Sequence, residues 1–268
     1  MTLRTPRAAA FAAFLGLVQR DVRVLTREPF TFLLRTLSQP LLLVFVFTYV
    51  FPTIGQGLSN PDGGSFTDIL VPGVLAITVL IKGIQSVALP LVQEFGYTRE
   101  IEDRVMAPLP MWAVGVEKIV VGAAQGFVAA LIVAPIAAVI PAQTVDLNVN
   151  WFALAGVMIL APLAASALGL VLGTAVDPNQ VPLMFSIVIL PVTFLGATYY
   201  PWAALDPIPW LQIATLANPL VYMAEGFRLA LTPQFDTMPP LAVFGALVVI
   251  TTVLGWLAVK GFERRVLT

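Results

Sequence analysis

Charged side chains of this chain gather in one stretch, residues 93–110, with the sequence QEFGYTREIEDRVMAPLP. Six charged residues lie there: Glu94, Arg99, Glu100, Glu102, Asp103 and Arg104. If residues 97–106 form a helix, Arg99–Asp103 and Glu100–Arg104 make i,i+4 ion pairs, each contributing only about 0.2–0.5 kcal/mol. The stretch separates two long apolar segments, so its charges must lie in water or against a polar partner. Spacing alone leaves both a solvated loop and a docking element open.

A second group of polar residues lies in an otherwise apolar part of the chain, residues 201–240. Pro207–Ala217 and Pro219–Leu231 are too short to cross a bilayer and have the length of re-entrant or interfacial helices. Asn218–Pro219 predicts the break between them, because a residue before proline is disfavoured in a helix. Glu225 and Arg228 stand three residues apart in the second segment. They form either a structural ion pair or part of a gate for a substrate.

Lys82 is the one charge near the middle of a long apolar segment. A lysine at the centre of a bilayer costs about 2.5–3.5 kcal/mol on insertion scales, so it should face protein or water. It either lines a transport pathway or directs its long stem toward the interface from an off-centre helix.

Several catalytic and metal-binding classes are excluded by what the sequence lacks. It has no cysteine and no histidine, which excludes disulfides, thiolate zinc sites and Ser-His-Asp triads. It has no Gly-Lys dipeptide, hence no Walker A loop, and no Gly-x-Ser-x-Gly elbow. We therefore expect no catalytic residue, metal or bound cofactor on this chain. Without a basic patch, nucleic acid is not an expected partner.

The composition is that of a membrane protein. The chain is 59% hydrophobic and 11% charged, against roughly 25% charged in a soluble domain. Its mean hydropathy is +0.92. Six segments have the roughly 17–25 residues, or slightly more, that a bilayer demands. They are Thr36–Ile54, Ile69–Val92, Val114–Ile140, Trp151–Val176, Val181–Tyr200 and Leu241–Val259.

The predicted fold is therefore an all-α polytopic membrane protein with six transmembrane helices in a single domain. Residues 1–35 hold an amphipathic helix over Ala8–Glu28, which lies in the headgroup layer or packs on a partner. Residues 36–200 hold spans one to five, residues 201–240 an extracytoplasmic re-entrant segment, and residues 241–268 span six and a tail.

The basic residues orient these spans. Twelve of the 14 lysines and arginines fall on the side that holds both termini and the 93–110 loop. The positive-inside rule places that side in the cytoplasm of a plasma (inner) membrane.

Small residues recur every four positions in two of the spans. They are Gly122, Gly126, Ala130 and Ala134 in the third, and Ala161, Ala165, Gly169 and Gly173 in the fourth. Such stripes let helix backbones approach closely. We expect packing within the chain, with a dimer seam as the alternative.

This order of parts resembles the ABC type-2 exporter permeases. Residues 94–108, EFGYTREIEDRVMAP, resemble that family's acidic-x-x-Gly-Thr-x-Glu pattern ending in proline, although Tyr97 stands between Gly96 and Thr98. Residues 196–228, GATYYPWAALDPIPWLQIATLANPLVYMAEGFR, resemble its Pro-x-Trp-Leu-Gln, Asn-Pro-Leu-x-Tyr and terminal Arg series. The resemblance covers nearly the whole chain.

The resemblance implies a permease driven by a separate ATPase subunit, which would carry the ATP and Mg²⁺. The 93–110 loop would be the coupling helix that contacts this ATPase, through Glu94, Gly96, Arg99, Glu100, Asp103 and Arg104. An outer gate would include Asn218, Pro219, Glu225 and Arg228. Two permease chains, identical or paralogous, would work with two ATPase chains.

The alanine-rich character is similar to exporters of the daunorubicin-resistance type, which implies a hydrophobic or amphipathic drug or lipid as substrate, with multidrug efflux or antibiotic resistance as the role. Export of a polysaccharide or lipid-linked glycan, a non-transporting assembly subunit and a lipid-modifying enzyme are the alternatives.

Overall fold

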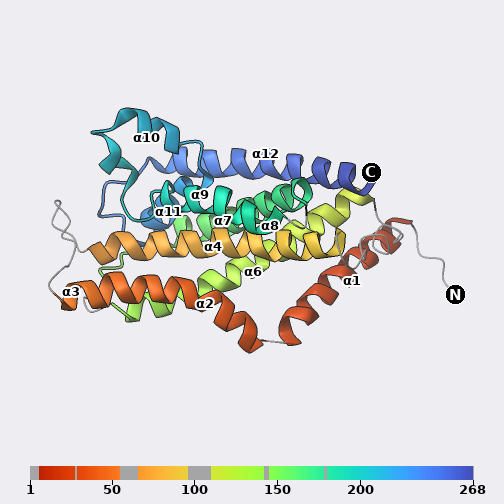
Figure 1. Cartoon of the computed structure of the whole chain (residues 1–268), viewed down its shortest axis with the longest axis horizontal. Helices are drawn as coiled ribbons and strands as arrows, with labels where there is room; N and C mark the ends of the chain where they lie inside the picture. The colour runs from red at the N-terminus through yellow and green to blue at the C-terminus, as the bar shows by residue number, and fades with distance from the viewer. Residues whose placement is uncertain are drawn as a thin grey trace.

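Helices running along one long axis make up the part of the chain that the structure describes (Figure 1). The structure is a computed structural model, and it describes residues 6–27, 29–54, 66–95, 110–141, 145–177 and 180–267. No strand occurs within those ranges. α1 (Pro6–Arg27) leans away from the bundle at the end where α12 finishes. The predicted all-α fold is confirmed, and α1 matches the predicted amphipathic helix.

Five helical runs in the described ranges are long and apolar enough to cross a membrane. The first joins α2 (Pro29–Phe45), a π-helical turn η1 (Val46–Val50) and α3 (Phe51–Thr53). The others are α4 (Phe66–Gln93), α6 (Met111–Val139), α7 (Trp151–Ala175) and α12 (Pro240–Leu267). Each matches a predicted span, and α12 extends past the predicted end through its basic tail.

The predicted fifth span is shorter and more irregular than expected. It consists of α8 (Val181–Met184), η4 (Phe185–Ile189) and α9 (Leu190–Phe194), a run about 21 Å long at 1.5 Å per residue. The helix ends at Phe194, six residues before the predicted Tyr200, and Ala197 then adopts a left-handed conformation with φ 51°. Five of the six predicted spans are therefore present at full length, and the predicted span over 181–200 is shorter than expected.

Prolines account for two π-helical turns, η1 and η4. η1 ends just before Pro52 and η4 just before Pro191. Proline has no N–H to donate to the carbonyl four residues earlier, and its ring crowds that carbonyl, so the preceding turn widens. Near each turn a threonine hydroxyl donates to a helix carbonyl, Thr48 to Val44 O at 2.7 Å and Thr193 to Ile189 O at 2.7 Å.

Two short helices follow, as predicted. After a 3₁₀ turn η5 (Trp202–Leu205) come α10 (Pro209–Thr215) and α11 (Pro219–Leu231). The break between them falls at the predicted Asn218–Pro219 step. α11 lies inside the bundle, where it contacts α4, α7 and α12.

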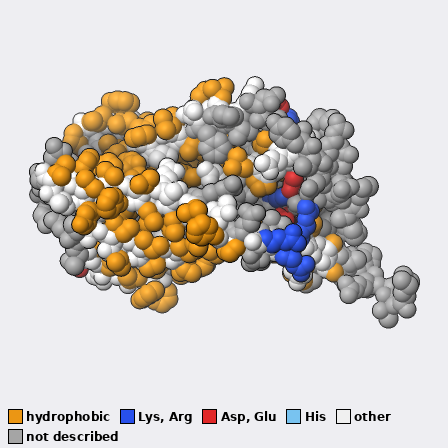
Figure 2. Space-filling model, turned by 60° about the horizontal axis from the view of Figure 1, so that its bottom comes forward, with side chains coloured by type: hydrophobic (Ala, Val, Ile, Leu, Met, Phe, Trp, Pro, Cys, Tyr) orange, Lys and Arg blue, Asp and Glu red, His pale blue; other side chains and the backbone are white. Residues whose placement is uncertain are grey.

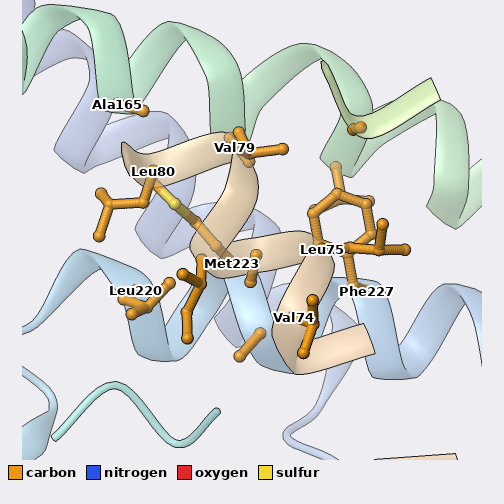
Figure 3. Close-up of a cluster of buried hydrophobic side chains, with 14 of the residues drawn as sticks. Val74, Leu75, Val79, Leu80, Ala165, Leu220, Met223 and Phe227 are labelled. Atoms are coloured by element: carbon orange, nitrogen blue, oxygen red, sulfur yellow. The ribbon is translucent and has the colours of Figure 1, made fainter. Parts of the chain in front are cut away.

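α4 is the centre of the bundle. Val74, Leu75, Val79 and Leu80 on α4 face Leu220, Met223 and Phe227 on α11, with Ala165 of α7 beside them (Figure 3). All of these side chains are buried. These contacts bury α4 on the sides that face α7 and α11.

The small-residue stripes pack within the chain, as predicted. A Cβ added at Gly169 would lie 2.8 Å from the Cα of Ile84 in α4. One added at Gly122 would lie 2.4 Å from Val87 Cγ2. These glycines let α6 and α7 approach α4 at near-backbone distance.

Gly169→Ala should therefore lower stability. The added methyl group would meet backbone atoms that cannot move aside, and such overpacking costs about 1–3 kcal/mol. Thermal unfolding of the purified chain, followed by tryptophan fluorescence, measures the effect. Gly245→Ala is the matched control, since no atom lies within 4 Å of that Cβ position. Equal Tm values for the two variants would refute the packing argument.

Candidate functional site

Three charged side chains from three helices meet at the end of the bundle where α4 stops and α6 begins. Lys118 Nζ on α6 lies 2.7 Å from Oε1 of Glu94, which directly follows α4. The same nitrogen lies 3.8 Å from Oδ2 of Asp21 on α1. Lys118 is only 5% exposed. We call these three residues the Asp21–Glu94–Lys118 cluster.

Other contacts tie α12 to the same end. The rings of Phe95 and Phe262 lie 6.2 Å apart, and the guanidinium of Arg265 stands 5.9 Å from the Phe95 ring. Arg265 Nη2 also pairs with Asp177 Oδ1 at 3.0 Å. The space-filling view shows Lys and Arg side chains gathered at one end, while hydrophobic side chains cover much of the rest of that face (Figure 2). α1, α4, α6 and α12 thus share a charged end.

The cluster frames the predicted 93–110 loop. Glu94 is buried and ion-paired at the start of that loop, and Lys118 lies in the second turn of the helix that follows it. The other predicted contact residues, Gly96, Arg99, Glu100, Asp103 and Arg104, lie outside the described residues.

Neither Asp21 nor Lys118 is singled out as a functional residue by the sequence alone. The available signal was a Glu117–Lys118 pair in the second turn of an otherwise apolar helix. A buried charge needs a partner, and Glu94 stands at the end of the preceding span. Reading the two together would have suggested the pair.

At the opposite end of the bundle, Asn218 and Pro219 build the start of α11. Asn218 Oδ1 accepts a hydrogen bond from Leu220 N at 3.0 Å, which caps the helix, and Pro219 occupies the first helical position, where no N–H is needed. Asn218 Nδ2 donates to Val192 O of α9 at 2.7 Å. One side chain thus begins α11 and ties it to α9.

Glu225 and Arg228 form a fully buried ion pair inside α11. Arg228 Nη1 lies 2.8 Å from Glu225 Oε1, and both side chains are 0% exposed. Glu225 also accepts backbone hydrogen bonds from Trp202 at 2.9 Å and Met238 at 3.1 Å. Arg228 Nη2 donates to the carbonyls of Ala197 and Thr198, the latter at 3.1 Å.

The Glu225–Arg228 pair is hydrogen-bonded to the backbone of four residues outside α11. Ala197, Thr198 and Trp202 precede this helix, and Met238 follows it. The turn at Ala197–Thr198 in turn contacts α4, because a Cβ added at Gly73 would lie 2.1 Å from Thr198 O. Only glycine permits that approach. The pair therefore acts as a clamp that fixes the loops around α11 to the core.

Lys82 lies apart from both sites. Its Nζ stands 4.1 Å from the centroid of the Phe32 ring on α2, a cation–π distance. The structure thus brings Glu94 together with Lys118, and Glu225 together with Arg228. It does not bring the loop residue Glu94, the Glu225–Arg228 pair and Lys82 together into one site. No set of three Asp or Glu side chains able to hold a metal occurs in the described ranges.

The arrangement matches a known family. The model of the ABC-2 type transporter family matches residues 12–232. The chain belongs to the ABC-2 type transporter family. It is also similar to the inner membrane transport permease YadH of Escherichia coli K12, with 30% identity over 220 residues, covering 80% of this chain and 82% of the relative. The YadH proteins of Escherichia coli O157:H7 and Shigella flexneri match with the same identity and coverage.

Membership of the ABC-2 family makes the chain a multi-pass membrane permease component. It also implies a partner ATPase of the ATP-binding cassette class. Both conclusions agree with the helical runs described above.

Arg228→Met should destabilise the protein by about 3–5 kcal/mol, because it leaves the Glu225 carboxylate buried without its partner. The double variant Glu225→Gln/Arg228→Met should recover part of that loss, since it removes the uncompensated charge and keeps one acceptor oxygen. Thermal unfolding of the purified variants measures both.

Arg265→Met is the control for that series. Its pair with Asp177 is exposed, at 35% and 64%, so its loss should cost less than about 1 kcal/mol. A double variant less stable than Arg228→Met alone would contradict the buried-charge argument.

Proposed function

We propose that this chain is the permease subunit of an ATP-driven exporter that moves a hydrophobic or amphipathic substrate, drug-like or lipid-like, out of the cytoplasm. A separate ATPase subunit supplies the energy and acts through the 93–110 loop. Two permease chains and two ATPase chains form the working unit, with the pathway between the permeases.

The observation that carries this proposal is the Asp21–Glu94–Lys118 cluster. It joins the two helices that flank the 93–110 loop, and it adds α1 through Asp21. A buried ion pair transmits displacement because separating its charges in an apolar setting is costly. A push on the loop by the ATPase would therefore move α1, α4 and α6 together.

The opposite end of the bundle is assigned to the outer gate. α10 and α11 form the re-entrant segment between spans five and six, with the α8–α9 run as the fifth of six spans. Asn218, Pro219, Glu225 and Arg228 keep that segment in place. The clamp geometry favours a positioning role for the ion pair over direct contact with substrate.

A hydrophobic or amphipathic substrate is supported by the apolar composition of the described spans. The described spans carry few polar side chains, and α4, α6 and α7 are enclosed by aliphatic residues and glycine. A glycan would require many more hydrogen-bonding groups along its path. The inner-membrane name of the relatives supports a location in the plasma membrane. The distribution of lysine and arginine favours placing both termini in the cytoplasm.

The absence of cysteine makes this topology directly testable. Ile101→Cys should react with a membrane-impermeant maleimide only from the cytoplasmic side. Trp210→Cys, at a position in α10 that is 71% exposed, should react only from outside. Labelling of intact cells and inverted vesicles separates the two. Reaction of position 101 from outside would overturn the proposed orientation and the coupling role of the loop.

Energy coupling is tested with the permease purified together with its ATPase. The permease should raise ATP turnover, and Glu100→Lys, Arg104→Glu and Lys118→Met should each remove that stimulation. Co-purification of the two subunits distinguishes lost coupling from lost assembly in each variant.

Lys260→Met is the matched control for the lysine variant. Lys260 lies at the end of α12, where its Nζ stands 4.0 Å from the Trp256 ring, and it is exposed. Its removal should leave the stimulation intact. If ATP turnover is indifferent both to the permease and to these three substitutions, the proposed function is wrong.

A further inference from the structure

A polar cavity lies between α2 and α4, inside the apolar part of the bundle. Its volume is about 40 Å³, and five polar side chains line it: Thr36 and Gln39 of α2, and Thr78, Lys82 and Gln85 of α4. Within α4, Thr78, Lys82 and Gln85 follow a spacing of four and then three residues, which places them on one helix face. Thr36 and Gln39 follow Phe32 at the same spacing on α2. Two polar faces therefore meet across this helix pair.

The cavity lies deep in the membrane-spanning part of α4. Lys82 is 14 residues after Asp68, or about 21 Å along the helix, and 12 residues before Glu94, or about 18 Å. Its ammonium rests over Phe32, near the start of α2. The Lys82 ammonium and the cavity beside it thus lie in the half of the membrane nearer the charged end of the bundle.

Thr36, one of the lining residues, carries a buried hydroxyl whose hydrogen bond is not made among the described residues. It is only 4% exposed, and its Oγ1 has no hydrogen-bond partner among the described residues. By contrast, the Thr78 hydroxyl donates to Val74 O at 2.7 Å. A buried polar group without a partner costs free energy, so a molecule that supplies one would be stabilised there.

The lining carries one positive charge and several hydrogen-bond donors. It contains an ammonium group, two side-chain amides and a hydroxyl with an unused proton, and no carboxylate among the described residues that line it. An ammonium carries three N–H donors, so Lys82 can keep its contacts within the protein and still donate to a ligand. The complementary ligand group is an acceptor, and a carboxylate or phosphate makes the strongest bonds of this kind.

The size of the cavity limits which part of a ligand can enter it. A cavity of about 40 Å³ has room for about three water molecules, which suits a small acidic group and not a whole lipid. Gln39 is exposed and Lys82 and Gln85 are half-buried, so the cavity reaches the surface of the helix pair. Apolar side chains also line the cavity, namely Pro40 of α2 and Ile77 and Ile81 of α4. They offer contacts to the apolar part of an amphiphile.

We propose that this α2–α4 cavity binds the acidic headgroup, carboxylate or phosphate, of an amphiphile that enters from the membrane. The inference rests on the proposed function and narrows its substrate class to acidic amphiphiles. Lys82 and Thr36 are the contacts that select the headgroup.

The test measures headgroup preference without ATP. The full-length permease with its ATPase is placed in phosphatidylcholine nanodiscs and titrated with fluorescent phosphatidic acid, and separately with fluorescent phosphatidylcholine of the same chains. The acidic probe should bind at least about tenfold more tightly, as expected for one charge-assisted hydrogen bond. Lys82→Met should abolish the preference, Lys82→Arg should keep most of it, and Thr36→Val should reduce it several-fold.

Lys260→Met is the control and should leave the preference unchanged. Equal binding of the two probes by the unaltered complex, or an undiminished preference in Lys82→Met, would overturn the inference. Competition by inorganic phosphate as effective as that by short-chain phosphatidic acid would also overturn it, because the site would then select a soluble anion. Failure of the ATPase stimulation test bears on the proposed function alone, since binding is measured here without turnover.

Discussion

Charge in an apolar interior is the constraint on which this structure depends. An ionised side chain removed from water must be paired and hydrogen-bonded within the protein, because its desolvation costs several kcal/mol. The chain meets this requirement at both ends of the bundle. Glu94 and Lys118 bracket a loop, whereas Glu225 and Arg228 bind backbone groups on both sides of α11. The need to pair and hydrogen-bond buried charges therefore determines which segments are held together.

Close packing adds a second constraint. Gly83, Gly169 and Gly173 bring α4 and α7 to distances at which an added methyl group would clash. Helices in contact at that distance slide or tilt as rigid bodies more readily than they deform, because packed interfaces have few empty spaces to close. Any movement of α4 must therefore involve α7 and α11 as well.

Much of this architecture could be predicted from the sequence. Hydropathy and length were enough for five spans, and the Asn218–Pro219 step was enough for the break between α10 and α11. Periodic small residues predicted the contacts of Gly169 and Gly122. These features are local, or they repeat along one helix, so a single sequence contains them.

The remaining features depend on contacts that a single sequence does not display. The early end of the α9 run follows from the left-handed turn at Ala197, which is held by Arg228, a residue 31 positions later. The pairing of Lys118 with Asp21 joins helices 97 positions apart. The polar cavity beside Lys82 arises only because Thr36 and Gln39 of α2 face the same side. In each case hydropathy predicts the helical segment, whereas the packing of the folded chain determines which residue of another segment it contacts.

α4 reaches both charged sites. Its first turns carry Gly73, which lies against the Thr198 carbonyl that Arg228 binds, and Glu94 follows its last turn. Pro72 and Pro90 stand near its two ends, where a missing N–H weakens the helix and permits bending. The segment between them has no such break and is buried by α6, α7 and α11. A displacement at Glu94 can therefore pass along this rod to the clamp or be absorbed at the prolines, so α4 is one physical connection between the two ends.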